Sequence, residues 1–396
     1  MNNFVYHIPT KVCFGKDTEN EAGSLLKEFG AKKALVHFGG GSVVKSGLLD
    51  KVCKSIKEAG IDYITLGGVV SNPRLSKVYE GVELGRKNGV DFILAVGGGS
   101  VIDSAKAIAY GIANEGDVWD FWARTRVPEA CLPVGSVLTI SAAGSEMSEA
   151  CVITKDEGLL KRGYTNNLSR PKFAIMNPEL TFTLPWYQVA SGAVDILMHT
   201  LERWFDKKRD SAQLTDAISI GLMKTVMRNA LVLKGNATDY NAAAELMWAG
   251  ALSHNGLTGC GGNWNPPVLP GDWATHQLEH ELGGMFEVAH GAGLSAVWGS
   301  WARYVSKDNP EYFAKLGKDL FGMGDGAAAE TVIKKLEDFF VSIDMPVTIA
   351  GLGVTLSEEA VKELAHKCSF FGKRTIGSYR PLDAGDMEAI YRAAKG

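Results

Sequence analysis

The chain has 396 residues, of which 46% are hydrophobic and 22% charged, and acidic and basic residues are interspersed to give a formal net charge of −4. This composition indicates a globular protein long enough for two domains, and the absence of a basic excess argues against nucleic acid as a partner. No apolar run approaches the roughly 18 residues of a membrane helix. The first residues, MNNFVYHIPTKVCFG, lack the basic segment and apolar run of a secretory signal.

The six cysteines are widely spaced and form no CxxC pair. This pattern favours reduced thiols over a disulfide framework. We therefore expect a cytoplasmic protein that does not associate with a membrane.

Short apolar runs alternate with amphipathic stretches along the first half of the chain. The apolar runs predict strands at 33–38, 62–66, 91–96, 132–138 and 173–176. The amphipathic stretches between them predict helices at 47–60, 75–89 and 101–113. Strands and helices that alternate in this way typically form a parallel sheet with helices on its faces.

The pattern changes near Leu184 and Pro185, after which apolar residues follow helical spacing and no convincing strand is found. The chain is therefore expected to form an α/β domain over residues 1–182 and an all-helical domain over residues 183–396. No internal repeat or low-complexity tract is visible.

A glycine-rich turn joins an expected strand to an expected helix in VGGGSVIDSAK, residues 96–106. Gly97 and Gly98 would let the backbone approach a phosphate closely, and the free amides and dipole of the helix start attract negative charge. Ser100 can cap the helix and add a hydroxyl donor. A tight turn with no ligand explains the same letters, because the motif is neither GxGxxG nor a Walker loop.

A second glycine run, FGGGSVVKSG at residues 38–47, follows the preceding strand. An acidic residue near such a strand end commonly binds the adenosine ribose of NAD, and its absence leaves room for the 2′-phosphate of NADP. This run contains no acidic residue, whereas Gly39, Gly40 and Ser42 offer amides and a hydroxyl and Lys45 offers a cation. The run therefore favours NADP over NAD, although a flexible loop remains an alternative.

A carboxylate and several histidines in the second half have the spacing of metal ligands. Asp195 and His199 are four residues apart and would share one helix face. His276 and His280 repeat that spacing, and His290 follows shortly after. One carboxylate with two or three imidazoles suits a divalent metal such as Fe or Zn. The alternatives are a capping pair and a set of hydrogen-bonded helical histidines.

The chain resembles the iron-containing alcohol dehydrogenase family in four motifs. In chain order they are SNPRLSKVYEGVELGRKNGVDFILAVGGGS, GGGSVIDSAK, GAVDILMHTLER and DWATHQLEHELGGMFEVAHGAG. The likeness covers essentially the whole chain and is greatest to the butanol dehydrogenase and NADPH-dependent aldehyde reductase branch. It implies a Rossmann-like N-terminal domain, an all-helical C-terminal domain and a cleft between them for cofactor and metal. It also implies a homodimer.

The resemblance assigns the metal ligands to Asp195, His199, His276 and His290. His280 matches a histidine beside the metal that is usually not a ligand. In the cofactor site, the family's pyrophosphate loop falls on Gly97, Gly98 and Ser100. Thr139 and Ser141 lie in TISAAGSE, where the family commonly reads TTAGTGSE, so Ser141 departs from the pattern. Lys161 aligns with a lysine that reaches the cofactor ribose, and the run at 39–42 resembles that of the NADPH-using branch.

These residues imply hydride transfer between NAD(P)H and a small aliphatic aldehyde or alcohol, with a metal that polarises the substrate oxygen. His280 is a candidate proton relay, with a purely orienting hydrogen bond as the alternative. Asp103 lies one turn into the phosphate-binding helix. It is a candidate for contact with the nicotinamide or the substrate, and the alternative is that it only stabilises the helix. Trp264 and Trp273 could line a pocket, although aromatic residues more often belong to the core.

Two rival functions are considered. A metal-dependent lyase or cyclase that resembles dehydroquinate synthases would keep its nicotinamide bound, but it would need a basic cluster for an anionic substrate, and the ligand segments show none. A non-catalytic metal- or nucleotide-binding module would not need both a complete ligand set and a cofactor loop.

Overall fold

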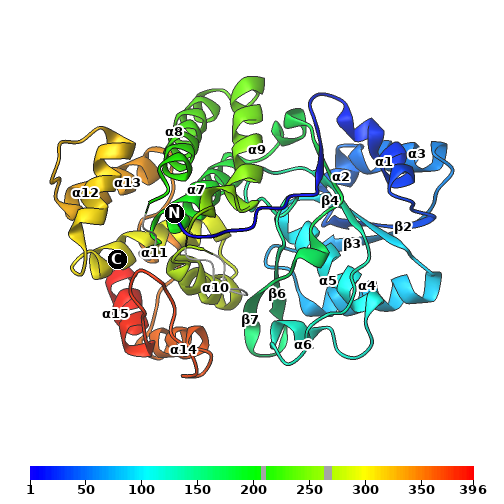
Figure 1. Cartoon of the computed structure of the whole chain (residues 1–396). Coiled ribbons are helices and arrows are strands. Elements are labelled where there is room, and N and C mark those ends of the chain that lie inside the picture. The colour runs from blue at the N-terminus through cyan, green and yellow to red at the C-terminus, as the bar shows by residue number, and fades with distance from the viewer. Residues whose placement is uncertain (207–210, 263–269) are drawn as a thin grey trace. The chain divides into compact units, whose positions relative to one another are not determined.

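The computed structural model describes residues 1–206, 211–262 and 270–396. The chain divides into two compact units (Figure 1). One unit contains residues 7–184, and the other contains residues 185–396 together with residues 1–6.

The first unit is built on a parallel six-stranded sheet with the strand order β1-β8-β5-β4-β2-β3. The strands of this sheet are β1 (Lys11–Phe14), β2 (Lys33–Gly39), β3 (Asp62–Val69), β4 (Phe92–Gly97), β5 (Val134–Leu138) and β8 (Phe173–Met176). Every residue of β4 is buried. A strand buried on both faces needs apolar residues throughout, which explains the unbroken run FILAV.

Helices cover both faces of this sheet (Figure 1). The helices of this unit are α1 (Ala22–Glu28), α2 (Ser42–Lys45), α3 (Leu48–Glu58), α4 (Leu75–Asn88), α5 (Gly99–Ala113) and α6 (Trp119–Trp122). Val36 and Leu94 form a core with residues of α1 and α3. His37, which follows Val36 in β2, bonds instead to Ser104 of α5. Because side chains alternate along a strand, α5 lies on the opposite face.

The predicted α/β class and parallel sheet are confirmed, and each predicted strand is present with small shifts at its ends. Two features of the strands were not predicted, and neither were the short helices α1, α2 and α6. The edge strand β1 is only four residues long, and an antiparallel hairpin joins β6 (Ala150–Lys155) to β7 (Leu160–Thr165). The hairpin strands ACVITK and LKRGYT carry several polar residues, so neither forms the apolar run on which the strand prediction relied.

The second unit is helical, as predicted, and its described residues contain no strand beyond an isolated bridge between Ile376 and Leu382. Its helices are α7 (Trp186–Trp204), α8 (Gln213–Gly235), α9 (Tyr240–His254), α10 (Ala274–Phe286), α11 (His290–Val305), α12 (Pro310–Phe321), α13 (Ala329–Ser342), α14 (Glu358–Cys368) and α15 (Ala384–Ala394). Among the described residues of both units, the short 3₁₀ turns are η1 (Thr18–Glu21), η2 (Glu157–Leu159), η3 (Asn167–Ser169), η4 (Pro178–Thr181), η5 (Leu257–Gly259) and η6 (Ala350–Leu352).

The central helix of the second unit is α7, which packs against α8, α9 and α11. All of its residues from Ala190 to Trp204 are buried. This stretch includes charged side chains, and a buried charge needs a partner. The polar residues of α7 are therefore the first place to look for a functional site.

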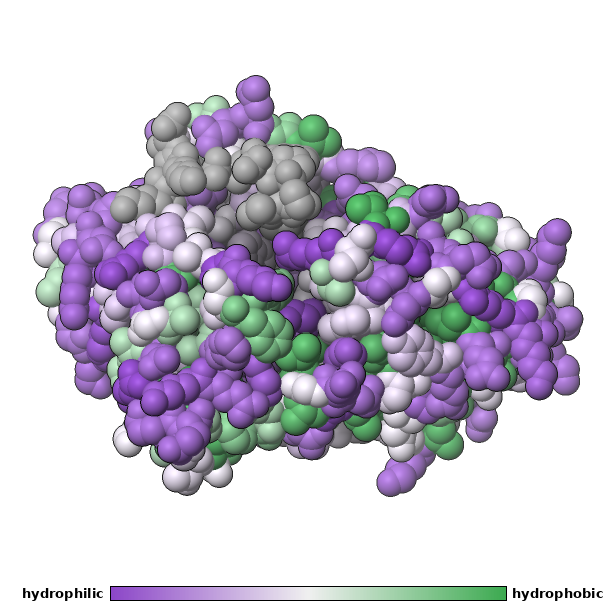
Figure 2. All heavy atoms as spheres, turned by 90° about the horizontal axis from the view of Figure 1, so that it is seen from below, coloured by the Kyte–Doolittle hydropathy of each residue, from purple (hydrophilic) through white to green (hydrophobic). Residues whose placement is uncertain are grey.

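The surface seen in Figure 2 is mainly hydrophilic, with hydrophobic residues interspersed. Among the described residues, no helix combines the length and apolar character needed to cross a membrane.

Candidate metal centre and cofactor loops

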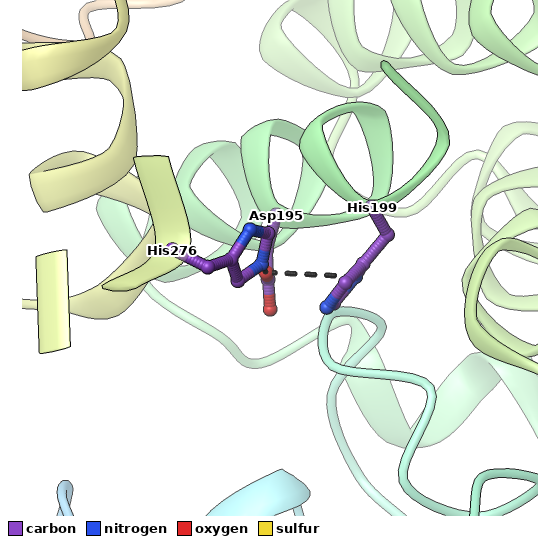
Figure 3. A group of neighbouring side chains, drawn as sticks. All are labelled: Asp195, His199 and His276. Atoms are coloured by element: carbon purple, nitrogen blue, oxygen red, sulfur yellow. Dashed lines mark ion pairs between the residues drawn. The ribbon is translucent and has the colours of Figure 1, made fainter. Parts of the chain in front are cut away.

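Three helices of the second unit bring one carboxylate and three imidazoles together. Asp195 and His199 lie one turn apart on α7, His276 lies in the first turn of α10, and His290 is the first residue of α11. Asp195 Oδ1 is 3.6 Å from His199 Nδ1, from His276 Nε2 and from His290 Nε2. Figure 3 shows the first three side chains converging from α7 and α10. The four residues predicted as metal ligands are thus neighbours.

The donor atoms of this cluster fit a divalent metal. Asp195 Oδ1, His199 Nδ1 and His276 Nε2 are buried, and within the described parts of the chain they have no hydrogen-bond partner. Burying such atoms without a partner is costly. Ligand bonds of about 2.1 Å in a tetrahedral arrangement place neighbouring ligand atoms about 3.4 Å apart, which is close to the 3.6 Å that separates Asp195 Oδ1 from each imidazole nitrogen. A single cation would therefore satisfy all of these atoms.

Two buried glutamates orient the histidines. Glu202 Oε2 is 2.7 Å from His276 Nδ1, and Glu279 Oε2 contacts His290 Nδ1. Both glutamate side chains are completely buried. A carboxylate on Nδ1 fixes the ring and leaves Nε2 for the metal, and Nε2 is the atom of each ring that faces Asp195.

Neither glutamate was predicted from the sequence, although their spacing gives a signal. Glu202 follows His199 by three residues on α7, and Glu279 follows His276 by three on α10. Residues three apart on a helix share a face. A search for carboxylates on the ligand-bearing faces would have found them.

The protonation of the histidines follows from burial and charge. Burial opposes protonation of His276, but the charges of Glu202 and Asp195 outweigh it and raise its pKa to about 9, so a metal that binds Nε2 must displace this proton. Burial, with the nearby His254 and other cationic groups, lowers the pKa of His199 well below its usual value. His199 is therefore held as a neutral imidazole, which is the form that binds a metal.

Two aromatic side chains, His254 and Trp273, lie beside the candidate metal ligands. The ring of His254, at the end of α9, has its centroid 4.0 Å from that of His199. The indole of Trp273 is stacked on His254 at 5.8 Å and meets His276 edge-on at 5.3 Å. Trp273 is thus next to the candidate ligands, whereas Trp264 lies outside the described residues. His254 was not predicted, because a lone histidine at a helix end carries no recognisable spacing.

His280 lies one turn after His276 on α10 and is buried. Its ligand atoms form a group with those of Glu279 and His290, and its ring centroid is 5.8 Å from that of His290. The side chain is therefore next to one candidate ligand and its glutamate partner, a position compatible with either a relay or an orienting role.

The predicted phosphate loop lies in the first unit, where β4 ends and α5 begins. Gly97 ends β4, Gly98 caps α5, and Ser100 lies in the first turn of that helix. A Cβ on Gly98 would lie 2.2 Å from Ile140 Cγ2, and one on Gly97 would lie 2.5 Å from Val101 Cγ2. Glycine is therefore needed here for packing as well as for any approach of a phosphate.

The second glycine run lies beside the first. Gly39 ends β2, which pairs in parallel with β4, so both runs leave the sheet at its carboxyl edge. Ligands of open α/β sheets bind at this edge. Gly40 follows, and Ser42 begins α2.

The remaining cofactor candidates lie elsewhere in the first unit. The Thr139 N–H donates to the Gly97 carbonyl at 3.2 Å, and Ser141 is buried shortly after. Lys161 is buried on β7. Asp103 accepts hydrogen bonds from Ser145 Oγ at 2.6 Å and from the Val152 N–H at 2.9 Å, the latter at its second carboxylate oxygen. Both oxygens of Asp103 thus bond to the chain itself.

Comparison with known proteins places this chain in a family. Residues 9–178 match the model of iron-containing alcohol dehydrogenases, and residues 189–395 match the C-terminal model of the Fe-containing alcohol dehydrogenase family. The chain is 34% identical to NADH-dependent butanol dehydrogenase A of Clostridium acetobutylicum over 99% of each chain. It is 32% identical to the NADPH-dependent aldehyde reductase YqhD of Escherichia coli over the full length of both.

The crystal structure of an NADH-dependent butanol dehydrogenase A from Thermotoga maritima superposes with a TM-score of 0.95 at 36% identity, covering 100% of this chain and 99% of that one. This chain therefore belongs to the iron-containing alcohol dehydrogenase family. It is an NAD(P)-dependent oxidoreductase of the alcohol dehydrogenase and aldehyde reductase class, as predicted. The lyase alternative is not favoured.

Proposed function

We propose that this enzyme interconverts a small aliphatic aldehyde and its alcohol with NADPH as the favoured cofactor, using one Fe or Zn ion held by Asp195, His199, His276 and His290. The observation that carries the proposal is the position of Asp195 Oδ1, 3.6 Å from three imidazole nitrogens in a buried site. The relatives named as butanol dehydrogenases and as an aldehyde reductase support the substrate class.

Each residue of the site has a definite task in this proposal. The metal, when bound, supplies a Lewis acid for the substrate oxygen. Asp195 supplies the negative charge of the ligand set. Glu202 and Glu279 bind Nδ1 of His276 and His290 and so fix the orientation of these two rings. His280 exchanges the proton that accompanies hydride transfer.

The cofactor assignment rests on the two glycine runs. Gly97, Gly98, Ser100, Thr139, Ser141 and Lys161 would bind the pyrophosphate and nicotinamide half of the cofactor. Gly39, Gly40 and Ser42 would accept the 2′-phosphate, because no carboxylate stands between residues 38 and 47 to repel it. The relatives include both NADH- and NADPH-dependent enzymes, so the choice of NADPH rests on the absence of an acidic residue from residues 38–47.

We further propose a cytoplasmic homodimer, whose mass in solution can be measured by light scattering.

The direct test of the function is a panel of straight-chain aldehydes assayed with NADPH and with NADH. We expect one NADPH to be oxidised for each aldehyde reduced, with a higher kcat/KM for NADPH than for NADH. Conversion of a substrate with no net change in the nicotinamide would overturn the proposal in favour of a lyase.

The Gly39→Asp substitution is expected to raise the KM for NADPH about tenfold or more, because a carboxylate there would repel the 2′-phosphate, and tenfold corresponds to only about 1.4 kcal/mol. The site has room: a Cβ on Gly39 would make ordinary contacts of 3.6 Å to the Val69 carbonyl oxygen and 3.8 Å to Val101. Gly39→Ala, which adds the Cβ without the charge, is the control. An unchanged ratio of the KM values for NADPH and NADH would reject this location for the phosphate.

A further inference from the structure

Lys106 of α5 is a completely buried cation. Its Nζ donates hydrogen bonds at 2.8 Å to the carbonyl oxygens of Ser145, Ser148 and Ala150 and to the hydroxyl oxygen of Ser145. Taking an ammonium group out of water is expensive unless its hydrogen bonds are replaced. These contacts replace them.

The segment that Lys106 binds has no regular structure. Residues 139–149 connect β5 to β6, and most of residues 141–149 are buried. Buried backbone carbonyls outside helices and strands need other donors, and Lys106 supplies several of them. The Arg170 guanidinium donates to the Met147 carbonyl and to the Glu149 carboxylate. Two cations thus fix the path of this segment.

A carboxylate on the same helix completes the arrangement. Asp103, one turn before Lys106, accepts a hydrogen bond from the Ser145 hydroxyl, which itself accepts one from Lys106 Nζ. Asp103 also accepts from the Val152 N–H, at the start of the hairpin. Burial lowers the pKa of Lys106, and the Asp103 charge opposes that shift. The two residues therefore attach the later part of the segment, from Ser145 on, and the start of β6 to α5.

The part of the segment that precedes Ser145 lies against the phosphate loop. Ile140 and Ala143 occupy the space over Gly98 and Gly99, since Cβ atoms on those glycines would lie 2.2 Å from Ile140 Cγ2 and 2.8 Å from Ala143 Cβ. The Thr139 N–H bonds to the Gly97 carbonyl. A shift of the segment by a few tenths of an ångström would therefore change the shape of the loop.

We propose that Lys106 is a positioning residue for the cofactor: by binding the carbonyls of Ser145, Ser148 and Ala150, it anchors the end of the segment 139–149 and so holds its earlier residues at the distance from Gly97 and Gly98 that nicotinamide cofactor binding requires. This inference rests on the proposed cofactor site. It makes the Lys of the glycine-rich motif a support for the loop and not a ligand of the phosphates.

The test is Lys106→Met, which keeps a long apolar side chain and removes the ammonium. We expect the dissociation constant for NADPH, measured by fluorescence titration of the metal-loaded enzyme, to rise about tenfold or more, and the KM for NADPH to rise with it. The KM for aldehyde at saturating NADPH and the metal content per chain should stay within about twofold of the wild type. Lys87→Met, which removes an exposed lysine of α4, should change none of these.

A second variant keeps the test decisive if Lys106→Met does not fold. Ser145→Ala removes the bridging hydroxyl alone, and we expect it to weaken NADPH binding about threefold with metal content unchanged. Folded variants that bind NADPH as tightly as the wild type, with or without a lower melting temperature, would overturn the inference and leave Lys106 a purely structural residue. Failure of the wild type itself to bind NADPH would instead overturn the proposed cofactor site.

Discussion

The His276→Ala enzyme is expected to lose its metal and to reduce aldehydes about a thousandfold more slowly than the wild type. A Lewis acid contributes several kcal/mol to such a reaction, and each 1.4 kcal/mol or so corresponds to about tenfold in rate. His276 provides one of the nitrogens 3.6 Å from Asp195 Oδ1. Its removal also leaves the buried Glu202 carboxylate without its imidazole partner. Metal per chain and kcat are the two measurements.

The control is His366→Ala, which removes an exposed histidine of α14 and should leave both values unchanged. Binding of NADPH to the His276→Ala enzyme should also persist, because the proposed cofactor residues belong to the other unit. A variant that keeps both its metal and its activity would show that His276 is not a ligand.

The Gly291→Ala substitution is expected to lower the melting temperature by about 10 °C and to reduce the metal content. A Cβ at residue 291 would lie 1.9 Å from the Ser191 carbonyl oxygen, which is backbone of α7. Because backbone cannot move aside cheaply, α11 must separate from α7, at a cost of about 3 kcal/mol. His290 precedes Gly291 on α11, whereas Asp195 lies on α7. The separation would therefore pull the ligand set apart.

Gly221→Ala is the matched control. Gly221 lies within α8, and a Cβ there would meet no atom within 4 Å. Alanine in an open helical position is more favourable than glycine by up to about 1 kcal/mol, so this variant should melt slightly higher than the wild type and keep its metal. If the two alanine variants melt at the same temperature, the close packing of α11 on α7 does not position His290.

Most of the first unit could be predicted because its sheet is parallel and buried. Strands such as β4 must be apolar on both faces, and that requirement is visible in the letters FILAV. The same rule explains the failures. The strand β1 is a four-residue edge, and β6 and β7 form an antiparallel hairpin with polar residues, so neither carries the signal of a buried parallel strand.

The candidate metal centre was predictable in part. Spacing alone placed Asp195 with His199 and His276 with His280 on helix faces, but the meeting of α7, α10 and α11 is a tertiary contact that no local pattern contains. Family resemblance supplied that step. Lys106 illustrates the remaining gap, because three of its four oxygen partners are backbone carbonyls and carbonyls leave no trace in a sequence.

Removal and return of the metal tests the central claim most directly. The freshly purified enzyme should contain one Fe or Zn ion per chain and should lose aldehyde reduction when a chelator removes that ion. Activity should return in proportion to the divalent metal added back, up to one equivalent. Full activity in metal-free protein would contradict the account, since Asp195 and the surrounding histidines would then have no part in hydride transfer.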